Sequence, residues 1–532
     1  MLKQLFRTKS LEQLRASAEE PEHQLKKNLG TFDLAMFGIG AIIGAGIFSS
    51  IGTAAAGGID GRPAAGPALV VSILIVAVAC GFTALAYAEM ASMIPVSGSA
   101  YTYTYATMGE LMAWVIGWDL LLEYAVSNVA VAISWGDYTR SFLSNVLGIH
   151  IPGWLAMDPR TSLMLSEGMR AQQMTLAEKL QAVVQAKQGL LDGAATFQNW
   201  DVLKDAPLLG GFPVTFNLLA VIVTILVTWL VYIGIKESAR VNTIMVVIKV
   251  AILLAVVGVG IKLIDKGNWV PFAPQGLRGI QAGAAIIFFA FIGFDAVSTT
   301  AEECRDPGRN LPAGILWSLG ICTIIYAAVA LVVTGMLKYT ELGMHADPLA
   351  FIFSQRGMTG WAGIISFGAI IATTAALLVY QVGQPRIFMS MSRDGLLGPW
   401  FGKVSPRYGT PGNATFVTGC IVAIPAAFLN ISEVVELTNI GTLFAFSLVC
   451  AGVLILRRTR PEAPRRFRMP WVWVTAPLGI LFCIWLAKGL PTITWIRFLA
   501  WLIIGLVVFF AYGHLNSMLH QKAEQATSSG RG

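Results

Sequence analysis

The stretch Gly38-Ile39-Gly40-Ala41-Ile42-Ile43-Gly44-Ala45-Gly46-Ile47-Phe48 lies in the first apolar segment of the chain and places four glycines within nine residues. Each glycine costs a helix about 1 kcal/mol relative to alanine, so this is a poor sequence for a simple membrane span. Small residues also let helices approach closely in lipid. The alternative is an unwound stretch, which is tolerated at membrane depth only where the backbone faces protein or a cavity. The stretch alone leaves both interpretations open.

A second interrupted stretch favours the unwound interpretation. Phe288-Phe289-Ala290-Phe291-Ile292-Gly293-Phe294-Asp295-Ala296 places a glycine and a carboxylate inside another apolar segment. If the first ten apolar segments form two halves of five, both stretches lie in the first segment of their half. Matching interruptions in the two halves of a transporter indicate its binding site. We therefore expect spans 1 and 6 to be discontinuous helices.

The composition predicts an all-α membrane protein. Of 532 residues, 55% are hydrophobic and only 13% are charged, with a mean hydropathy of +0.67. A soluble domain carries about 25% charged residues. The net charge of +7 does not indicate a nucleic-acid partner, because the basic residues gather in loops on one side of the spans. No cysteine pairing in exterior loops, metal-ligand spacing of histidines or phosphate-binding loop is found, and no cofactor is expected.

A membrane span needs about 20 apolar residues, and twelve segments qualify. These are about 32–58, 66–94, 109–147, 214–235, 241–264, 279–302, 312–337, 359–390, 413–430, 434–457, 471–490 and 495–514. The distribution of Lys and Arg predicts that the N-terminal tail (1–31) and the C-terminal tail (515–532) are both cytoplasmic, as in a multi-pass protein of the cell's inner (plasma) membrane. One long outer loop (about 148–213) contains a helical pattern, which predicts a surface helix or, alternatively, a partner-docking helix.

Broken helices offer backbone groups that suit a zwitterion. The start of the second half-helix presents N–H groups, and the end of the first presents carbonyls. We expect a substrate carboxylate on the amides of Gly44, Ala45 and Gly46. We expect its ammonium on carbonyls near Phe289, Ala290 and Ile292. A free amino acid carries both groups on one carbon.

Four charged residues within the apolar segments need an explanation, because such charges usually face the bundle interior or water. Lys249 is either a snorkelling lysine or an interior ammonium that holds broken helix 1 and releases a proton. Glu123 is either a polar bridge or part of a proton and substrate path. Asp119, one turn away, is expected to be structural. Asp295 is either a helix cap or a coupling carboxylate.

The chain resembles the amino acid–polyamine–organocation superfamily, and within it the cationic amino-acid transporter branch with its bacterial members. The resemblance covers about residues 30–515 and rests on five motifs in order. These are Gly40-Ala-Ile-Ile-Gly-Ala-Gly-Ile-Phe48, Tyr87-Ala-Glu-Met90 with Ile94-Pro-Val-Ser-Gly98, Phe291-Ile-Gly-Phe-Asp295, Glu303-Cys-Arg-Asp-Pro-Gly-Arg-Asn-Leu-Pro312, and Gly383-Gln-Pro-Arg-Ile387 with Ser392-Arg-Asp-Gly-Leu396.

The resemblance implies a LeuT-like fold of two inverted five-span repeats, 32–264 and 279–457, followed by two extra helices, 471–514. In proton-coupled members a lysine of span 5 replaces the bound sodium, and Lys249 matches its position, so protons are expected rather than sodium. Glu89 matches an acidic residue with a gating or structural role. The long outer loop departs from the family. Three further residues are expected to line the substrate site: Ile43, Phe294 and Thr373.

The expected function is secondary active transport of L-amino acids by alternating access, coupled to protons, with a cationic (Arg or Lys) or small neutral (Ala) substrate. An amino-acid exchanger of the same fold is the alternative. A channel would show a repeated pore motif or charged rings, and neither is found. Nothing indicates a receptor or an enzyme. The expected partners are the amino acid and the lipid bilayer; a small accessory subunit is not indicated.

Overall fold

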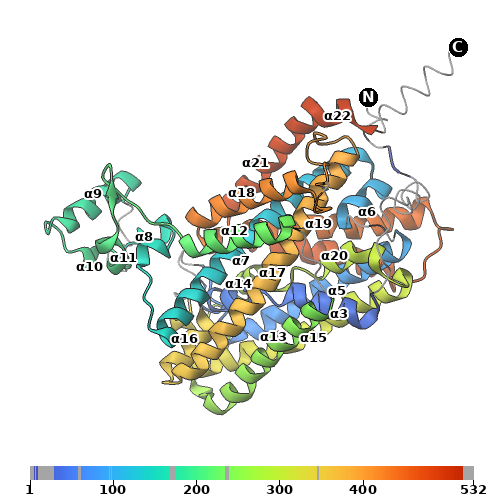
Figure 1. The fold of residues 1–532 in the computed structure, drawn as a ribbon. Helices are drawn as coiled ribbons and strands as arrows, with labels where there is room; N and C mark the ends of the chain where they lie inside the picture. Colours follow the sequence, from blue (N-terminus) through green and yellow to red (C-terminus); the bar gives the residue numbers. More distant parts are fainter. Residues whose placement is uncertain are drawn as a thin grey trace.

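The computed structural model describes residues 5, 7–9, 29–57, 62–94, 96, 99–166, 174–233, 239–343, 347–405 and 407–518. Within these residues, nine helical segments are long and apolar enough to cross a membrane. Three shorter apolar helices, Leu218–Ile233, Gly412–Phe428 and Val472–Ala487, lie where the sequence analysis places spans 4, 9 and 11. The fold is that of an all-helical, multi-pass membrane protein (Figure 1).

The helices of the bundle follow in chain order. They are α3 (Thr31–Ile42), a π-helical turn (Gly46–Ser50), α4 (Ile51–Ala56), α5 (Leu69–Met93), α6 (Ser99–Thr107), α7 (Glu110–Leu147), α12 (Leu218–Ile233), α13 (Ala239–Gly260), α14 (Gly276–Ile287), two 3-10 segments (Phe288–Phe291 and Asp295–Glu303), α15 (Pro307–Met336), α16 (Pro348–Gln355), α17 (Thr359–Arg393), α18 (Gly412–Phe428), α19 (Ile431–Thr459), α20 (Val472–Ala487), α21 (Thr492–Val508) and α22 (His514–Asn516).

The interrupted helices occupy the centre of the bundle. In the most apolar window of each span, 94% of the residues are buried for Thr31–Ala56, Glu110–Leu147 and Gly276–Ser298, against 28% for Thr243–Leu263 and 22% for Thr492–Asn516. Helix α3 packs against α13, α15 and α17, and α7 packs along α17 and α19. Spans 1, 3 and 6 are therefore enclosed by protein, where irregular backbone is tolerated.

The two ends of the bundle are distinguished by what lies there. At the tail end, the Glu110 N–H donates to the Arg7 carbonyl at 3.1 Å, and the Ser517 hydroxyl donates to the Glu110 carboxylate at 2.6 Å. The first and last described parts of the chain thus meet at the start of α7. At the loop end, Asn430, just before α19, donates to the Thr161 hydroxyl at 2.6 Å.

The described residues between α7 and α12 form a small folded unit at the loop end, here called the loop subdomain (148–166 and 174–213; Figure 1). Its elements are α8 (Pro159–Ser162), α9 (Leu176–Lys187), α10 (Gly193–Thr196), α11 (Trp200–Asp205), and the hairpin β1 (Leu208–Leu209) and β2 (Phe212–Pro213). Thr175 and Glu178 form a capping box that starts α9. Val183 of α9 packs with Phe197 and Leu203 in a separate core. Helix α9 therefore belongs to a subdomain with its own interior.

Candidate functional site

The first interruption follows α3. Helix α3 ends at Ile42, and Ile43 takes an extended conformation with φ −76° and ψ 90°. The chain turns back into helical geometry at Ala45 and continues through the π-helical turn into α4. The hydroxyl of Tyr326 donates to the Ile42 carbonyl at 2.9 Å, which supplies a partner to a carbonyl freed by the break.

The second interruption follows α14. The 3-10 segment Phe288–Phe291 is succeeded by Ile292, which is extended at φ −65° and ψ 136°. Gly293 then adopts φ +123°, which favours glycine because a side chain would be strained there. The Gly293 N–H donates to the Asp295 carboxylate at 3.3 Å, so Asp295, the first residue of the second half-segment, supplies an acceptor to a backbone donor at the break.

The two interruptions lie against each other. A Cβ added to Gly46 would overlap the backbone of Ala290, and one added to Gly293 would come within 2.8 Å of the carbonyl carbon of Ala41. The glycines thus allow close packing at the same place where the helices are interrupted. The close packing and the unwound backbone that the glycine-rich stretch predicted as alternatives are therefore both present.

The ammonium of Lys249 holds the end of α3. Its Nζ donates to the Gly40 carbonyl at 2.6 Å and to the Ile43 carbonyl at 2.9 Å, and the side chain is fully buried. Both acceptors lie at the C-terminal end of the first half-helix, where carbonyls lack helical partners and the helix dipole favours a cation.

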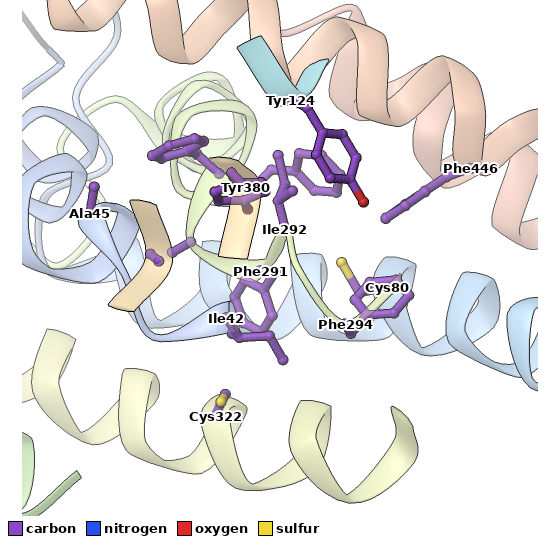
Figure 2. Packing of buried hydrophobic residues seen from close by; sticks show 14 of the residues in the cluster. Ile42, Ala45, Cys80, Tyr124, Phe291, Ile292, Phe294, Cys322, Tyr380 and Phe446 are labelled. Carbon is purple, nitrogen blue, oxygen red and sulfur yellow. The ribbon is translucent and has the colours of Figure 1, made fainter. Parts of the chain in front are cut away.

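Aromatic and aliphatic side chains surround the interruptions. Figure 2 shows Ile42 and Ala45 of span 1 near Ile292 of span 6, with aromatic side chains from other helices in the same region. Ring centroids are 5.0 Å apart for Phe294 and Phe446 of α19. The rings of Tyr124 on α7 and Tyr380 on α17 meet edge to face at 5.6 Å. The walls around the breaks are therefore largely apolar, with a few hydroxyl groups.

Two carboxylates of α7 lie one helical turn apart in the interior. Glu123 is buried, faces Thr442 of α19 and lies within electrostatic reach of Asp295. Asp119 is also buried, and within the described part of the chain neither of its carboxylate oxygens has a hydrogen-bond partner. Its Oδ1 lies 2.7 Å from where a Cβ on Gly441 would be. Asp119 thus reaches the α19 backbone without a polar contact of its own.

Glu89 lies at the tail end, away from the interruptions. Its carboxylate accepts two hydrogen bonds from Arg457, both at 2.8 Å, one from Arg465 at 3.1 Å and one from the Met469 N–H at 2.8 Å. Arg465 also donates to the Leu456 and Arg460 carbonyls at the end of α19. Glu89 therefore joins α5 to the end of α19 and the following loop.

Residues of α7 and α17 also lie around the breaks, and apart from the predicted Thr373 they carry no signal in the sequence. Ala376 of α17 faces Gly44, because a Cβ on that glycine would lie 3.1 Å from the Ala376 methyl. Thr373, one turn earlier, is buried and donates to the Ala369 carbonyl of its own helix at 2.6 Å. Tyr138 donates to the Phe48 carbonyl at 2.6 Å. Alanine and tyrosine are ordinary residues in apolar spans, so only the packing identifies these positions.

Comparison with known proteins identifies the family. The model of a family described as amino acid permease matches residues 29–509. Over 517 residues, 97% of this chain, the chain is 42% identical to the branched-chain amino acid permease BcaP of Bacillus subtilis and 39% identical to the methylthioribose transporter of the same organism, covering 99% of each. Over 464 residues it is 34% identical to the vacuolar cationic amino acid transporter 4 of Arabidopsis thaliana, covering 86% of this chain and 68% of that protein. All three relatives are named as transporters or permeases. The chain belongs to the amino acid permease family.

Proposed function

We propose that this protein carries L-amino acids across the membrane by alternating access and that protons drive the transport. The observation that carries the proposal is the contact between the two interruptions, where Gly46 lies against Ala290 and Lys249 holds the end of α3. In this arrangement the N–H groups of Gly44, Ala45 and Gly46 bind the substrate carboxylate. Carbonyls of the span 6 break, near Phe289, Ala290 and Ile292, bind the ammonium.

Lys249 is the proposed proton site. Its charged ammonium holds the Gly40 and Ile43 carbonyls with charge-assisted hydrogen bonds, which are about twice as strong as neutral ones. Loss of the proton weakens both bonds and frees the end of α3 to move. The ammonium also occupies carbonyls that would otherwise suit a metal cation, which supports protons over sodium. Glu123 and Asp295 are the carboxylates through which a proton reaches this region.

Twelve spans and two cytoplasmic tails are the proposed topology. The described parts nearest both chain ends meet at the start of α7, which supports an even number of crossings. In this proposal the three shorter apolar helices, Leu218–Ile233, Gly412–Phe428 and Val472–Ala487, cross the membrane together with the nine longer segments of the described residues. The abundance of Lys and Arg in the loops at the tail end supports placing that end in the cytoplasm.

Aliphatic amino acids are the first proposed substrate class. The walls around the breaks include Ile292, Phe294 and Phe446, which favour an apolar side chain. The name of the branched-chain permease relative agrees with this class. Cationic amino acids are the second class, because Glu123 is a buried carboxylate near the breaks and several relatives are named as cationic amino acid transporters.

Uptake into proteoliposomes tests the proposal. Purified protein is reconstituted, and uptake of labelled Leu, Arg and Ala is measured under an imposed proton gradient, an imposed sodium gradient or neither. We expect leucine to accumulate with the proton gradient only. Accumulation driven by sodium would contradict the role of Lys249, and exchange without any gradient would identify an antiporter. Uptake of none of the three would contradict amino-acid transport itself.

A further inference from the structure

A cavity of about 400 Å³ opens at the loop end. Its walls come from segments far apart in the sequence: the residues after α4, α8 of the loop subdomain, α14, α19, and α21 with the loop before it. The charged residues among them are Arg62, Arg160, Glu433, Glu436 and Arg497. Three arginines and two glutamates leave one excess positive charge on this wall, which favours an anionic group.

Two of the arginines share one acceptor atom. Arg160 and Arg497 both contact Oε1 of Glu433, Arg497 at 2.8 Å. Their side chains are 59% and 39% exposed, whereas Glu433 is 21% exposed. A guanidinium has five N–H donors and binds a carboxylate through two parallel hydrogen bonds. This pair of arginines therefore has the donors to hold a second carboxylate at little cost in desolvation.

The residues at the bottom of the cavity are more buried than Arg160 and Arg497 and have more polar contacts. Glu436 is buried, contacts Arg62 and accepts a hydrogen bond from Thr494 at 2.7 Å. One turn further along α19, Asn439 donates to the Ala285 carbonyl of α14 at 2.7 Å. Helix α14 lines the cavity through Ala282 and leads directly into the span 6 interruption. The cavity thus lies over α14, which continues into the span 6 break, and over α19, whose Phe446 packs against Phe294 at that break.

Arg160 is held in place by the loop subdomain. It lies in α8, whose N-terminal cap Asp158 accepts a hydrogen bond from the Thr161 N–H at 2.9 Å. The Thr161 carbonyl accepts from Asn199 at 2.7 Å, and its hydroxyl accepts from Asn430 at 2.6 Å. The subdomain therefore presents Arg160 to the start of α19 from a fixed backbone.

We propose that this cavity is a second, weaker substrate site, in which Arg160 and Arg497 bind the carboxylate of an amino acid on its way to the breaks. The inference rests on the proposed function. The incoming carboxylate replaces Glu433 as a partner of one arginine. In this way the loop subdomain, which departs from the family pattern, becomes part of the substrate path.

Binding stoichiometry and uptake kinetics test the proposal in the full-length protein. Labelled L-leucine, L-arginine and L-alanine are the probes for equilibrium binding. The protein without substitutions is expected to bind two molecules of the preferred probe, and Gly44→Leu, which fills the central site, to retain one weakly bound molecule. A competitor without a carboxylate, the corresponding amino-acid amide, is expected not to displace that molecule.

The double variant Arg160→Gln/Arg497→Gln is expected to lose the weak site and to raise the KM for uptake about tenfold, because the substrate carboxylate loses its charge-assisted hydrogen bonds to the two guanidinium groups. Its maximal rate should stay within about twofold, since uniform binding affects KM more than kcat. Lys204→Gln, which removes an exposed cation of the same subdomain away from the cavity, is the matched control and should change neither value.

Three results would overturn the proposal: one bound molecule per protein without substitutions, no binding to Gly44→Leu protein that is shown to be folded by size-exclusion chromatography, or an unchanged KM in the double arginine variant. Binding of none of the three probes to the protein without substitutions would overturn the proposed function and this site together. A single bound molecule with normal uptake would overturn this site alone.

Discussion

The two ends of the bundle are closed by acidic residues and arginines in unlike ways. At the tail end, Glu89 accepts four hydrogen bonds from three donor residues, and the side chains of Glu89 and Arg465 are each 1% exposed. At the loop end, Glu433 offers one oxygen to two arginines beside a cavity, whose side chains are 59% and 39% exposed. The Glu89 carboxylate thus has four hydrogen bonds and is shielded from solvent, whereas the Glu433 cluster has fewer contacts and is open to solvent.

This difference indicates that separating the ion pairs costs more free energy at the tail end than at the loop end. Separating Glu89 from Arg465 leaves buried charges without partners, which is expensive. Separating Glu433 from Arg160 returns both groups to water, where exposed ion pairs contribute about 0–1 kcal/mol. The contacts of the tail-end cluster favour the structural role expected for Glu89 over the gating role, as a joint between α5 and α19. The loop-end cluster can exchange partners during transport.

The largest expected effect comes from breaking the tail-end joint. Glu89→Ala leaves Arg465 buried and uncompensated, and loss of one partner of a buried ion pair costs about 3–5 kcal/mol. We expect a much lower midpoint of thermal unfolding in detergent and little folded protein. A variant that melts with the parent protein would show that the two ends do not differ in this way.

The second prediction concerns Lys249, which lies between the ends. Lys249→Ala should abolish leucine accumulation driven by a proton gradient, because the carbonyls of Gly40 and Ile43 lose their charged partner. Uptake in proteoliposomes measures this, with circular dichroism to show that the protein stays helical. Lys262→Ala, an exposed lysine just after α13, is the control. Unchanged accumulation in the Lys249 variant would remove this lysine from coupling.

The loop-end counterpart of the first substitution should have a small effect on stability. Glu433→Ala removes a partner shared by two exposed arginines, so the free energy of unfolding should fall by less than about 1 kcal/mol. Thermal unfolding beside Glu89→Ala makes the comparison direct. Equal losses in the two variants would contradict the distinction between a structural joint and an exchangeable cluster.

Salt should produce the smallest and most selective effect. At 1 M ionic strength the Debye length falls to about 3 Å, which screens exposed charges far more than buried ones. The KM for uptake should rise with an impermeant salt, because the loop-end arginines attract the substrate carboxylate less. The thermal unfolding midpoint should change little, since the Glu89 cluster is excluded from water. A midpoint that falls in parallel with uptake would oppose this interpretation.

The sequence predicted the class of fold and the place of the interruptions, for reasons tied to particular residues. Gly44 and Gly293 stand in apolar segments that would otherwise favour unbroken helices, so their positions could be read directly. The binding roles of the residues around them stay predictions. Partners across helices could not be read: nothing in the sequence pairs Tyr326 with Ile42 or Ala376 with Gly44, because such contacts depend on packing between distant segments.

The arginines near the end of α19 illustrate the same limit. In the sequence, the arginines between 457 and 468 count only as part of the Lys and Arg distribution that predicts the orientation of the chain across the membrane. In the structure, Arg457 and Arg465 bind Glu89, so these charges also hold two helices together. The same arginines thus contribute to the orientation of the chain in the membrane and to an ion-pair cluster between helices, and only the structure shows the second role.

The separate core of the loop subdomain has a practical consequence. Val183, Phe197 and Leu203 pack in a core of their own, and Thr161 is hydrogen-bonded to Asn430 at the start of α19. The subdomain is therefore expected to move with that helix as a rigid body. A fluorophore placed at the exposed Leu190 would magnify a small tilt of α19 into a large displacement. Single-molecule energy transfer from such a dye could follow each transport cycle without touching the buried interior.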